Sequence, residues 1–408
     1  MSLNPLPGKR IVLGVSGSIA CYKVADLASK LTQAGALVDT ILTAAATRFI
    51  TPLTFQAVTG RRAYTDADLW GQEAHVLHVG LGHTADLLVI APATANTLAK
   101  LAQGQAADLL SLTATAATCP LLVAPAMDGG MFTHAAVQAN LATLTARGVH
   151  IVGPEEGHLA SGLVARGRMS EPALLLGRIR HLLAQKGALQ GRKVVVTAGG
   201  TREAIDPVRF LSNHSSGKQG YALAQAALDV GAQVTLISTT AALTAPVGAR
   251  LVTVDSALEM LDAVLRECAD ADALIMAAAV ADFRPATVAD QKIKKQQGAP
   301  ILTLTPNPDI LATIAQQRQA SGYPRTVVGF AAETENLLAN AQSKLERKGL
   351  SLIVANDVSA SDAGFAVDTN RVTLLTADGR AESLPLLSKT AVAERVIQFV
   401  IEQATYSS

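Results

Sequence analysis

The same local pattern opens each half of the chain: a run of aliphatic residues, a glycine-rich turn, and a stretch with helical periodicity. Residues 9–15 lead into Gly14-Val-Ser-Gly-Ser18, and residues 192–198 lead into Gly199-Gly200. Aliphatic strands that alternate with helical stretches are typical of parallel sheets covered by helices on both faces. The repeated pattern therefore predicts an α/β chain with two doubly wound, Rossmann-like domains whose sheets are mostly parallel.

The length of the chain fits two such domains, because 408 residues exceed what one hydrophobic core normally organises. We place the boundary near residue 190, which gives domains of residues 1–190 and 191–408. Residues 365–384 alternate around Ala377-Asp-Gly379 and predict an antiparallel hairpin, and residues 389–403 predict a closing helix. Further buried strands are predicted at residues 36–42, 86–91, 120–124, 149–153, 233–238, 273–279, 326–331 and 350–355.

Composition excludes several classes of function. With a formal net charge of +1 and no suggestive cluster of lysine and arginine, the chain lacks the charge expected of a nucleic-acid-binding protein. The longest apolar runs are of strand length, and the first residues do not resemble a signal peptide. Cys21, Cys119 and Cys268 are scattered without metal-ligand spacing, as expected for buried thiols in a reducing compartment. We therefore expect a cytoplasmic protein that acts on small molecules, without a nucleic-acid or membrane partner.

The first glycine turn, Gly14 to Ser18, has features of an anion-binding site. Glycines let an anion approach the backbone amides, a helix N-terminus favours negative charge, and Ser16 and Ser18 add hydroxyl donors. The spacing is not that of a dinucleotide fingerprint, no P-loop lysine follows, and the acidic residue of an NAD-binding enzyme is missing. A plain strand–helix turn remains the alternative interpretation.

A second anion-binding surface is predicted in the other half. Asn213-His-Ser-Ser-Gly-Lys218 supplies amides, hydroxyls and one cation just before a predicted helix. Other polar segments have ordinary explanations when taken singly. Residues 292–295 read as a solvated charge run, Asn307-Pro-Asp309 as a helix-starting turn, and Lys344 with Lys348 as an exposed helix face.

In their order along the chain, these segments carry a family resemblance. Residues 43–50, 78–82, 91–97 and 124–132 resemble the flavin-dependent cysteine decarboxylases. The whole chain resembles the bacterial fused phosphopantothenoylcysteine decarboxylase/phosphopantothenate–cysteine ligases of coenzyme A biosynthesis. This resemblance implies a flavodoxin-like N-terminal domain with His78 as its active-site histidine. It also implies that FMN is held by Gly14, Ser16, Gly17, Ser18, Thr43, Ala91, Thr94 and Asn96.

Two positions of the N-terminal half depart from the family pattern. Asp128 stands where the family has asparagine, and Ser161 stands where a flap cysteine donates a proton to an ene-thiol intermediate. An ionised Asp128 cannot donate to a substrate carboxylate and repels it. A serine hydroxyl is also far less acidic than a thiol, whose pKa is about 8.5. We therefore expect decarboxylation to be impaired or lost.

Two alternatives to this expectation remain. In the first, both activities are intact, with Asp128 kept protonated by burial or with a rearranged proton donor. In the second, the N-terminal half is a non-catalytic flavin-binding scaffold that assembles the ligase into an oligomer.

In the C-terminal half, residues 197–203, 206–218, 277–284, 307–310, 329–334 and 355–357 resemble the ligase domain. The resemblance implies CTP-dependent joining of cysteine to 4'-phosphopantothenate through an acyl-cytidylate, with Asn213 orienting that intermediate and Arg209 assisting at the phosphopantothenate end. It also implies a Mg²⁺ ion on the phosphates, with unknown protein ligands, and a homo-oligomeric assembly. The expected CTP contacts are Met276, Ala277, Ala278, Asp282, Lys292, Pro308, Asp309, Ile310, Leu311, Phe330, Lys344 and Lys348.

Overall fold

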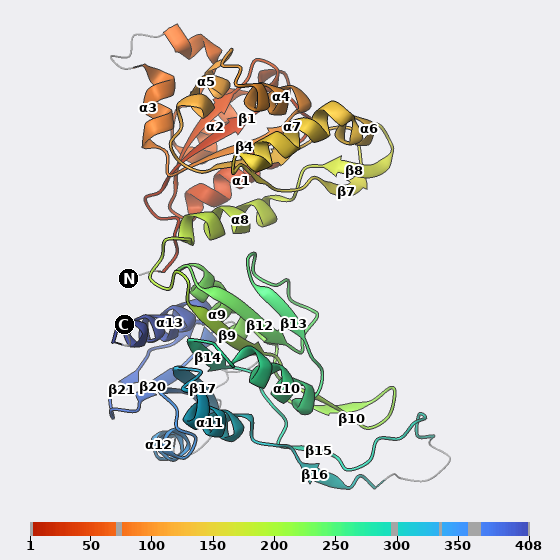
Figure 1. Cartoon of the computed structure of the whole chain (residues 1–408), viewed down its shortest axis with the longest axis vertical. Helices are drawn as coiled ribbons and strands as arrows, with labels where there is room; N and C mark the ends of the chain where they lie inside the picture. The colour runs from red at the N-terminus through yellow and green to blue at the C-terminus, as the bar shows by residue number, and fades with distance from the viewer. Residues whose placement is uncertain (1–2, 71–75, 295–300, 334–336, 358–368, 407–408) are drawn as a thin grey trace. The chain divides into compact units, whose positions relative to one another are not determined.

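The computed structural model describes residues 3–70, 76–294, 301–333, 337–357 and 369–406. They form two compact units, one of Asn4–Leu183 and one that begins at Ala184 and also includes Leu3. Each unit is an α/β domain built around a central sheet (Figure 1). The boundary predicted near residue 190 lies in the turn before the first strand of the second unit.

The sheet of the N-terminal unit is parallel, with the strand order β3-β2-β1-β4-β5-β6. When the two-residue edge strand β3 is set aside, the order counted along the chain is 2-1-3-4-5, which is that of flavodoxin-like folds. The strands are β1 (Arg10–Val15), β2 (Leu37–Leu42), β3 (Ala63–Tyr64), β4 (Leu87–Ala93), β5 (Leu121–Pro125) and β6 (His150–Ile151).

Helices cover both faces of this sheet because each buries an apolar stripe against it. In α1 (Cys21–Gln33), Val24, Leu27 and Leu31 recur at helical spacing and are fully buried. The same face carries α2 (Pro52–Thr59) and α8 (Pro172–Ala184). The other face carries α3 (Leu77–Thr84), α4 (Ala95–Gln103), α5 (Leu109–Ala116) and α7 (Ala135–Ala146). Shorter elements are η1 (Ala46–Arg48), η2 (Asp66–Trp70), α6 (Gly129–Thr133), β7 (Glu155–His158) and β8 (Val164–Arg168).

The sheet of the C-terminal unit has the order β13-β12-β9-β14-β17-β18-β20-β21. Its first six strands are parallel, and their order along the chain is 3-2-1-4-5-6, which is the Rossmann order. The antiparallel hairpin predicted around Ala377-Asp-Gly379 is confirmed as β20 and β21, whereas residues 365–368 of that prediction lie outside the described residues. The strands are β9 (Lys193–Ala198), β12 (Gln233–Ser238), β13 (Arg250–Thr253), β14 (Ala273–Met276), β17 (Thr326–Glu333), β18 (Leu352–Asp357), β20 (Val372–Thr376) and β21 (Ala381–Ser383).

Two hydrophobic cores lie on the two faces of this second sheet. One contains α9 (Lys218–Leu228) and the closing helix α13 (Lys389–Tyr406). The other contains α10 (Ala257–Glu267), α11 (Ile310–Ser321) and α12 (Leu337–Arg347). Three small antiparallel pairs complete the unit: β10 (Arg202–Ala204) with β11 (Phe210–Ser212), β15 (Phe283–Pro285) with β16 (Leu304–Pro306), and β19 (Thr369–Asn370) with β22 (Leu387–Ser388).

The three cysteines are unpaired. Cys21 and Cys268 are buried in cores, and burial raises the pKa of the Cys268 thiol to about 12. Cys119 is only half-buried, so the expectation of buried thiols is wrong for this residue. In the part of the chain that the structure describes, no helix combines the length and apolar character that a bilayer crossing requires.

Helix α9 lies close to strand β9 because Gly220 faces the strand. A Cβ atom at Gly220 would lie 2.5 Å from Cβ of Ala198 and 2.8 Å from the carbonyl oxygen of Thr197. Any larger side chain would push the helix N-terminus away from the strand end. The position of this N-terminus thus depends on glycine at residue 220.

We expect Gly220→Ala to lower the free energy of unfolding of the C-terminal unit by about 1–3 kcal/mol, because it overpacks this contact. Denaturant unfolding measures the change. The control is Ala222→Ser, which adds one atom at a half-buried position of the same helix and should cost about 0.5 kcal/mol. Equal stability of the two variants would show that the helix moves without cost.

Candidate functional site

Both units have a cavity at the point where the strand order reverses. In the N-terminal unit the turns after β1 and β4 meet there, and in the C-terminal unit the turns after β9 and β14 do. Ligands of open α/β sheets bind at such points, beyond the carboxyl ends of the strands. The two glycine turns predicted from the sequence both lie at these positions.

The cavity of the C-terminal unit has a volume of about 550 Å³. Asn213 and every predicted CTP contact except Lys292 line it. The full lining is Asn213, Ser215, Ser216, Gly217, Lys218, Gln219, Gly220, Met276, Ala277, Ala278, Ala279, Val280, Ala281, Asp282, Asn307, Pro308, Asp309, Ile310, Leu311, Phe330, Ala331, Lys344, Lys348, Asn356, Asn370 and Lys389.

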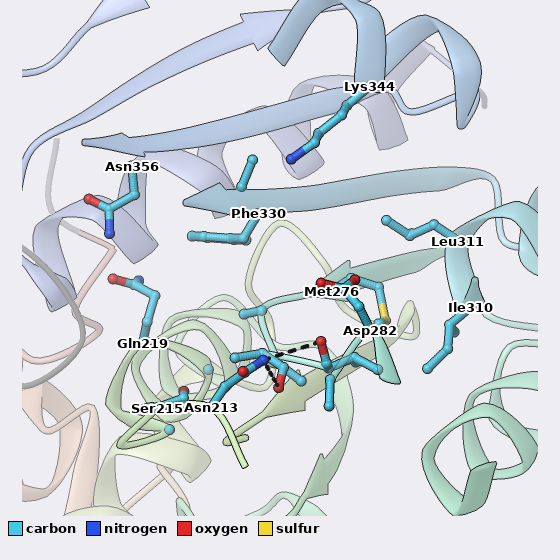
Figure 2. Close-up of a pocket in the computed structure, with 18 of the residues that line it drawn as sticks. Asn213, Ser215, Gln219, Met276, Asp282, Ile310, Leu311, Phe330, Lys344 and Asn356 are labelled. Atoms are coloured by element: carbon cyan, nitrogen blue, oxygen red, sulfur yellow. Dashed lines mark hydrogen bonds between the residues drawn. The ribbon is translucent and has the colours of Figure 1, made fainter. Parts of the chain in front are cut away.

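The two sides of this cavity differ in chemistry. Figure 2 shows Ile310 and Leu311 on one side, and Gln219 and Asn356 on the other. Asn356 is buried, and its side-chain oxygen has no hydrogen-bond partner among the described residues. A buried acceptor of this kind normally has a partner, so it is available to a donor on a ligand.

The charges of the lining favour an anionic ligand. Four lysines line the cavity, against the carboxylates of Asp282 and Asp309. Asp309 caps α11 by accepting from the Ala312 amide at 3.1 Å, and it pairs with Lys348, one of the four lysines, at 3.2 Å. The N-terminus of α9, which follows Gly217, adds backbone amides and a favourable helix dipole.

Residues 277–282, between β14 and β15, form one wall of the cavity and have no regular secondary structure of their own. Their backbone groups are bound partly by neighbouring backbone, as where the Ala279 amide donates to the carbonyl oxygen of Gly199 at 2.8 Å, and partly by side chains. Asn213 Nδ2 donates to the carbonyl oxygens of Ala279 and Val280, each at 3.3 Å (Figure 2). Asn307 Nδ2 donates to the carbonyl oxygen of Ala281 at 2.8 Å. The wall is therefore held in one conformation by several parts of the chain.

Arg209 and Lys292 are the two predicted ligase residues that do not line the cavity. Lys292 is exposed on the segment between β15 and β16. Arg209 donates through Nε to Asp206 at 2.9 Å and through a terminal nitrogen to the carbonyl oxygen of Ile293 at 2.9 Å. Arg209 therefore contacts the residue next to Lys292, but neither of the two lines the cavity.

The cavity of the N-terminal unit has a volume of about 610 Å³. Of the predicted FMN contacts, Ser16, Gly17, Ser18, Thr43, Thr94 and Asn96 line it, whereas Gly14 and Ala91 do not. Gly14 lies in β1 against Leu110, and Ala91 is fully buried in β4. The lining also contains Ala44, Ala45, Asp66, Ala95, Thr97, Lys100, Ala107, Asp108, Ala126, Met127 and Met131.

Hydrogen bonds shape the turns of this cavity. Ser16 is buried, and its hydroxyl donates to the carbonyl oxygen of Pro92 at 2.6 Å and accepts from the Thr94 amide at 3.0 Å. A Cβ atom at Gly17 would lie 2.4 Å from Cβ of Ala45, so only glycine allows this close approach. The Thr94 hydroxyl caps α4 by accepting from the Thr97 amide at 3.4 Å.

The two residues that depart from the family pattern contact each other. Ser161 Oγ, in the turn between β7 and β8, donates to Asp128 Oδ2 at 2.6 Å. Asp128 caps α6, and its other oxygen accepts from the Gly130 amide at 2.9 Å. The hydrogen bond from Ser161, followed by that from the Gly130 amide, lowers the pKa of Asp128 below its ordinary value. Both donors therefore favour the ionised form of this carboxyl.

His78 is half-buried in α3 and is not among the described residues that line the cavity. Neither Asp128 nor Ser161 lines it, although their neighbours Met127 and Met131 do. The described part of the chain contains no group of three or more His, Cys, Asp and Glu side chains suited to a metal ion.

Comparison with known proteins agrees with this division of the chain. The flavoprotein family model matches residues 2–183, and the model of the DNA/pantothenate metabolism flavoprotein C-terminal domain matches residues 189–404. The coenzyme A biosynthesis bifunctional protein CoaBC of Vibrio vulnificus is 46% identical over 97% of this chain and 98% of its own length. That of Bacillus subtilis is 46% identical over 96% of this chain and 97% of its own. The chain belongs to the CoaBC family.

Solved structures resemble each half separately. The C-terminal domain of a CoaBC protein is 39% identical, with a TM-score of 0.46, and covers 54% of this chain and 98% of its own. The FMN-dependent cysteine decarboxylase SpaF is 36% identical, with a TM-score of 0.40, and covers 44% of this chain and 98% of its own. As a CoaBC family member, the chain combines a flavoprotein half with a ligase half and serves coenzyme A biosynthesis.

Several lining residues of this CoaBC family member were not predicted from the sequence. Gln219 Nε2 donates to the carbonyl oxygen of Lys389 at 3.1 Å, and Gln219 accepts from Asn370 Nδ2 at 3.0 Å. These residues come from three distant parts of the chain, and no local spacing connects them. In the other cavity, Lys100 pairs with Asp108 at 2.6 Å, again without a sequence signal.

Asp206 anchors the segment that carries Lys292. Its buried carboxylate accepts from the amides of Val208 and Arg209 at 2.9 Å and from that of Ile293 at 3.2 Å. The Arg209 guanidinium is the largest cause that holds the pKa of this carboxyl well below its usual range. A carboxyl whose pKa is depressed by folding stabilises the fold above its unfolded pKa, and this effect is lost as the pH falls toward the folded pKa.

We therefore expect Asp206→Asn to lower the free energy of unfolding at pH 7. The difference in free energy of unfolding between this variant and the unsubstituted chain should become smaller as the pH falls below about 4. Denaturant unfolding at pH 7 and pH 3 measures both values. The control Asp255→Asn removes an exposed carboxylate 3.7 Å from Arg202 and should change the free energy of unfolding by less than about 1 kcal/mol. A difference in free energy of unfolding that does not depend on pH would contradict the role given to the charge of Asp206.

Proposed function

We propose that the C-terminal half is a phosphopantothenate–cysteine ligase that uses CTP. One observation carries the proposal: Asn213, the N-terminus of α9 and four lysines meet the wall of residues 277–282 in one cavity. Backbone amides and lysines are what a triphosphate requires. Membership of the CoaBC family supports the choice of substrates.

The proposed reaction has two steps. The carboxylate oxygen of 4'-phosphopantothenate attacks the α-phosphorus of CTP, the bond from this phosphorus to the bridging oxygen breaks, and pyrophosphate leaves with the electron pair. The cysteine amine then attacks the acyl carbon, the bond to the phosphate oxygen breaks, and CMP leaves while the amine loses a proton. The first step is needed because a free carboxylate is a poor acyl donor to an amine nucleophile.

Each proposed role uses a lining residue where possible. Asp282 and Phe330 seat the nucleoside together with the backbone of residues 276–278 and 308–311, Lys344 and Lys348 contact the nucleotide, and Asn213 orients the acyl-cytidylate. We also assign Lys292 to the triphosphate and Arg209 to the phosphopantothenate end. Because neither lines the cavity, these two roles require their segments, or those of a second copy in a homo-oligomer, to come to it.

A magnesium ion fits this site as a partner of the nucleotide. Asp282 and Asp309 line the cavity, and the described residues offer no larger group of acidic or histidine ligands there. Mg²⁺ commonly binds one or two carboxylates together with phosphates and water. The ion would neutralise charge on the triphosphate, so most of its ligands would come from CTP.

We expect continuous release of pyrophosphate only when CTP, cysteine and 4'-phosphopantothenate are all present, because without cysteine the reaction stops at the acyl-cytidylate after one release. Asn213→Ala should lower kcat/KM about 100-fold, because a misplaced reactive group costs that much. A coupled pyrophosphate assay and detection of the cysteine product measure both. The control Lys193→Ala removes an exposed lysine that pairs with Asp270 and should leave the rate unchanged. An Asn213→Ala rate equal to that of the unsubstituted chain would remove Asn213 from the site.

For the N-terminal half, we propose an FMN site in the 610 Å³ cavity. The glycine turn, the Ser18 hydroxyl and the capped N-terminus of α4 provide the donors that a flavin phosphate needs. The close approach of Gly17 to Ala45 keeps this turn free of side chains. Bound FMN would supply the redox chemistry of a cysteine decarboxylase, and the flavoprotein family match supports a flavin here.

We further propose that decarboxylation by this half is impaired or lost. The hydrogen bonds that lower the pKa of Asp128 favour its ionised form, which repels a substrate carboxylate to which an amide would donate. The Ser161 hydroxyl already donates its proton to Asp128, with an Oγ to Oδ2 distance of 2.6 Å. A serine hydroxyl is also a poor acid for a carbanion-like centre. The alternatives remain an intact decarboxylase with another donor and a flavin-binding scaffold without catalysis.

Restoring the family residues tests this proposal. We expect the double variant Asp128→Asn with Ser161→Cys to release CO2 from phosphopantothenoylcysteine at least about 100-fold faster than the unsubstituted chain, since a positioned general acid contributes about that much. A radiometric or coupled CO2 assay in the presence of FMN measures both rates. The yellow flavin absorbance of the purified proteins controls for equal FMN content. Full turnover by the unsubstituted chain would reject the impairment.

A further inference from the structure

Thr201 lies next to the ligase cavity without lining it. It follows Gly200 directly, precedes β10, and is fully buried, so it cannot touch a ligand. Both of its polar groups nevertheless bind the wall of residues 277–282. Its amide donates to the carbonyl oxygen of Ala279 at 3.2 Å, and its hydroxyl accepts from the Ala281 amide at 2.9 Å.

The peptide units held by Thr201 are the ones that hold Asn213. The Asn213 amide group donates to the carbonyl oxygens of Ala279 and Val280, which Figure 2 marks as two dashed lines. Both acceptors are carbonyls, so the nitrogen of this side chain must face the wall and its oxygen must face away. The orientation of Asn213 is therefore set by where residues 279–281 lie.

We infer that Thr201 is a positioning residue of the ligase that acts through Asn213, and this inference rests on the proposed function of the C-terminal half. Thr201 binds the wall on both sides of Val280, through its amide to Ala279 and through its hydroxyl to Ala281. Loss of its hydroxyl leaves the buried Ala281 amide without this partner, and the wall must shift to find another. Such a shift moves the two carbonyls that orient Asn213.

A second threonine shows how the role of Thr201 differs from general support of the wall. The hydroxyl of Thr197, in β9, accepts from the Ala278 amide at 3.1 Å and supports the beginning of the wall, whereas Asn213 donates to Ala279 and Val280. Thr201 supports the part that does. An effect on catalysis that depends on Asn213 is therefore expected for Thr201 specifically.

The test is a double-mutant cycle between Thr201→Val and Asn213→Ala, followed as kcat/KM for 4'-phosphopantothenate at saturating CTP and cysteine. Valine keeps the shape of threonine and removes the hydroxyl. We expect Thr201→Val to lower kcat/KM about tenfold in the otherwise unsubstituted chain and less than about twofold in the Asn213→Ala background. Thr201→Ser, which keeps the hydroxyl, should recover most of the activity.

The matched control is Thr373→Val, which removes a buried hydroxyl that bonds Ser383 at 3.1 Å in the same unit and does not line the cavity. It should leave kcat/KM unchanged in both backgrounds. Thermal unfolding is measured for every variant. If Thr201→Val is unfolded at the assay temperature, Thr201→Cys, with a weaker acceptor of similar size, replaces it in the same cycle.

Two results would overturn the inference: no loss of kcat/KM in Thr201→Val, or the same loss with and without Asn213. Either result, in an unsubstituted chain that is active, rejects the role of Thr201 and leaves the ligase proposal standing. Absence of ligase activity in the unsubstituted chain would reject the proposed function itself, and the role of Thr201 with it.

Discussion

The ligase cavity depends on hydrogen bonds between side chains and the irregular backbone of residues 277–282. A chain segment that leaves a buried strand without entering a helix must still satisfy its polar groups. Here Thr197, Thr201, Asn213 and Asn307 do so, and they come from the ends of neighbouring strands and their turns. Because the partners belong to separate elements, the wall, the glycine turn and the start of α11 keep a common geometry. The shape of this wall thus follows from the need to give its backbone groups hydrogen-bond partners.

The two units place different chemistry at equivalent points of similar sheets. In both, a glycine after the first strand lets a helix N-terminus or a loop approach closely, at Gly17 against Ala45 and at Gly220 against Ala198. In the C-terminal unit the remaining lining is rich in lysine and amide groups. In the N-terminal unit it is mostly small residues and hydroxyls, with Lys100 already paired with Asp108. The first suits a polyanion, and the second suits a flat cofactor with one phosphate.

Sequence reasoning was most successful where local patterns decide the structure. The aliphatic runs predict the strands and the glycine-rich segments predict the turns that follow them, because hydrophobic periodicity and the need for positive φ or close approach are local properties. Most predicted nucleotide contacts, such as Phe330 and Asp282, line one cavity because the parallel order brings the strand ends together. The fold class is confirmed by the two sheets.

Other parts of the site depend on contacts that no local pattern encodes. Gln219, Asn370 and Lys389 meet only because α9, β19 and α13 pack side by side. The engagement of Arg209 by Asp206 follows from a turn whose geometry its sequence does not reveal. The direct contact of Asp128 with Ser161 likewise required the hairpin β7–β8 to fold back on α6. The family resemblance was sufficient to mark these two positions as unusual, but not to show that they bind each other.

The closing helix α13 has a consequence for how this protein is handled in the laboratory. Its first residue, Lys389, lines the ligase cavity, and the Gln219 side chain binds its carbonyl oxygen. The same helix packs Val392, Val396 and Val400 into the core beneath α9. This helix thus contributes both to the lining of the cavity and to the core. Trimming into this helix, or crowding it with a fused tag, alters the binding surface as well as the tail.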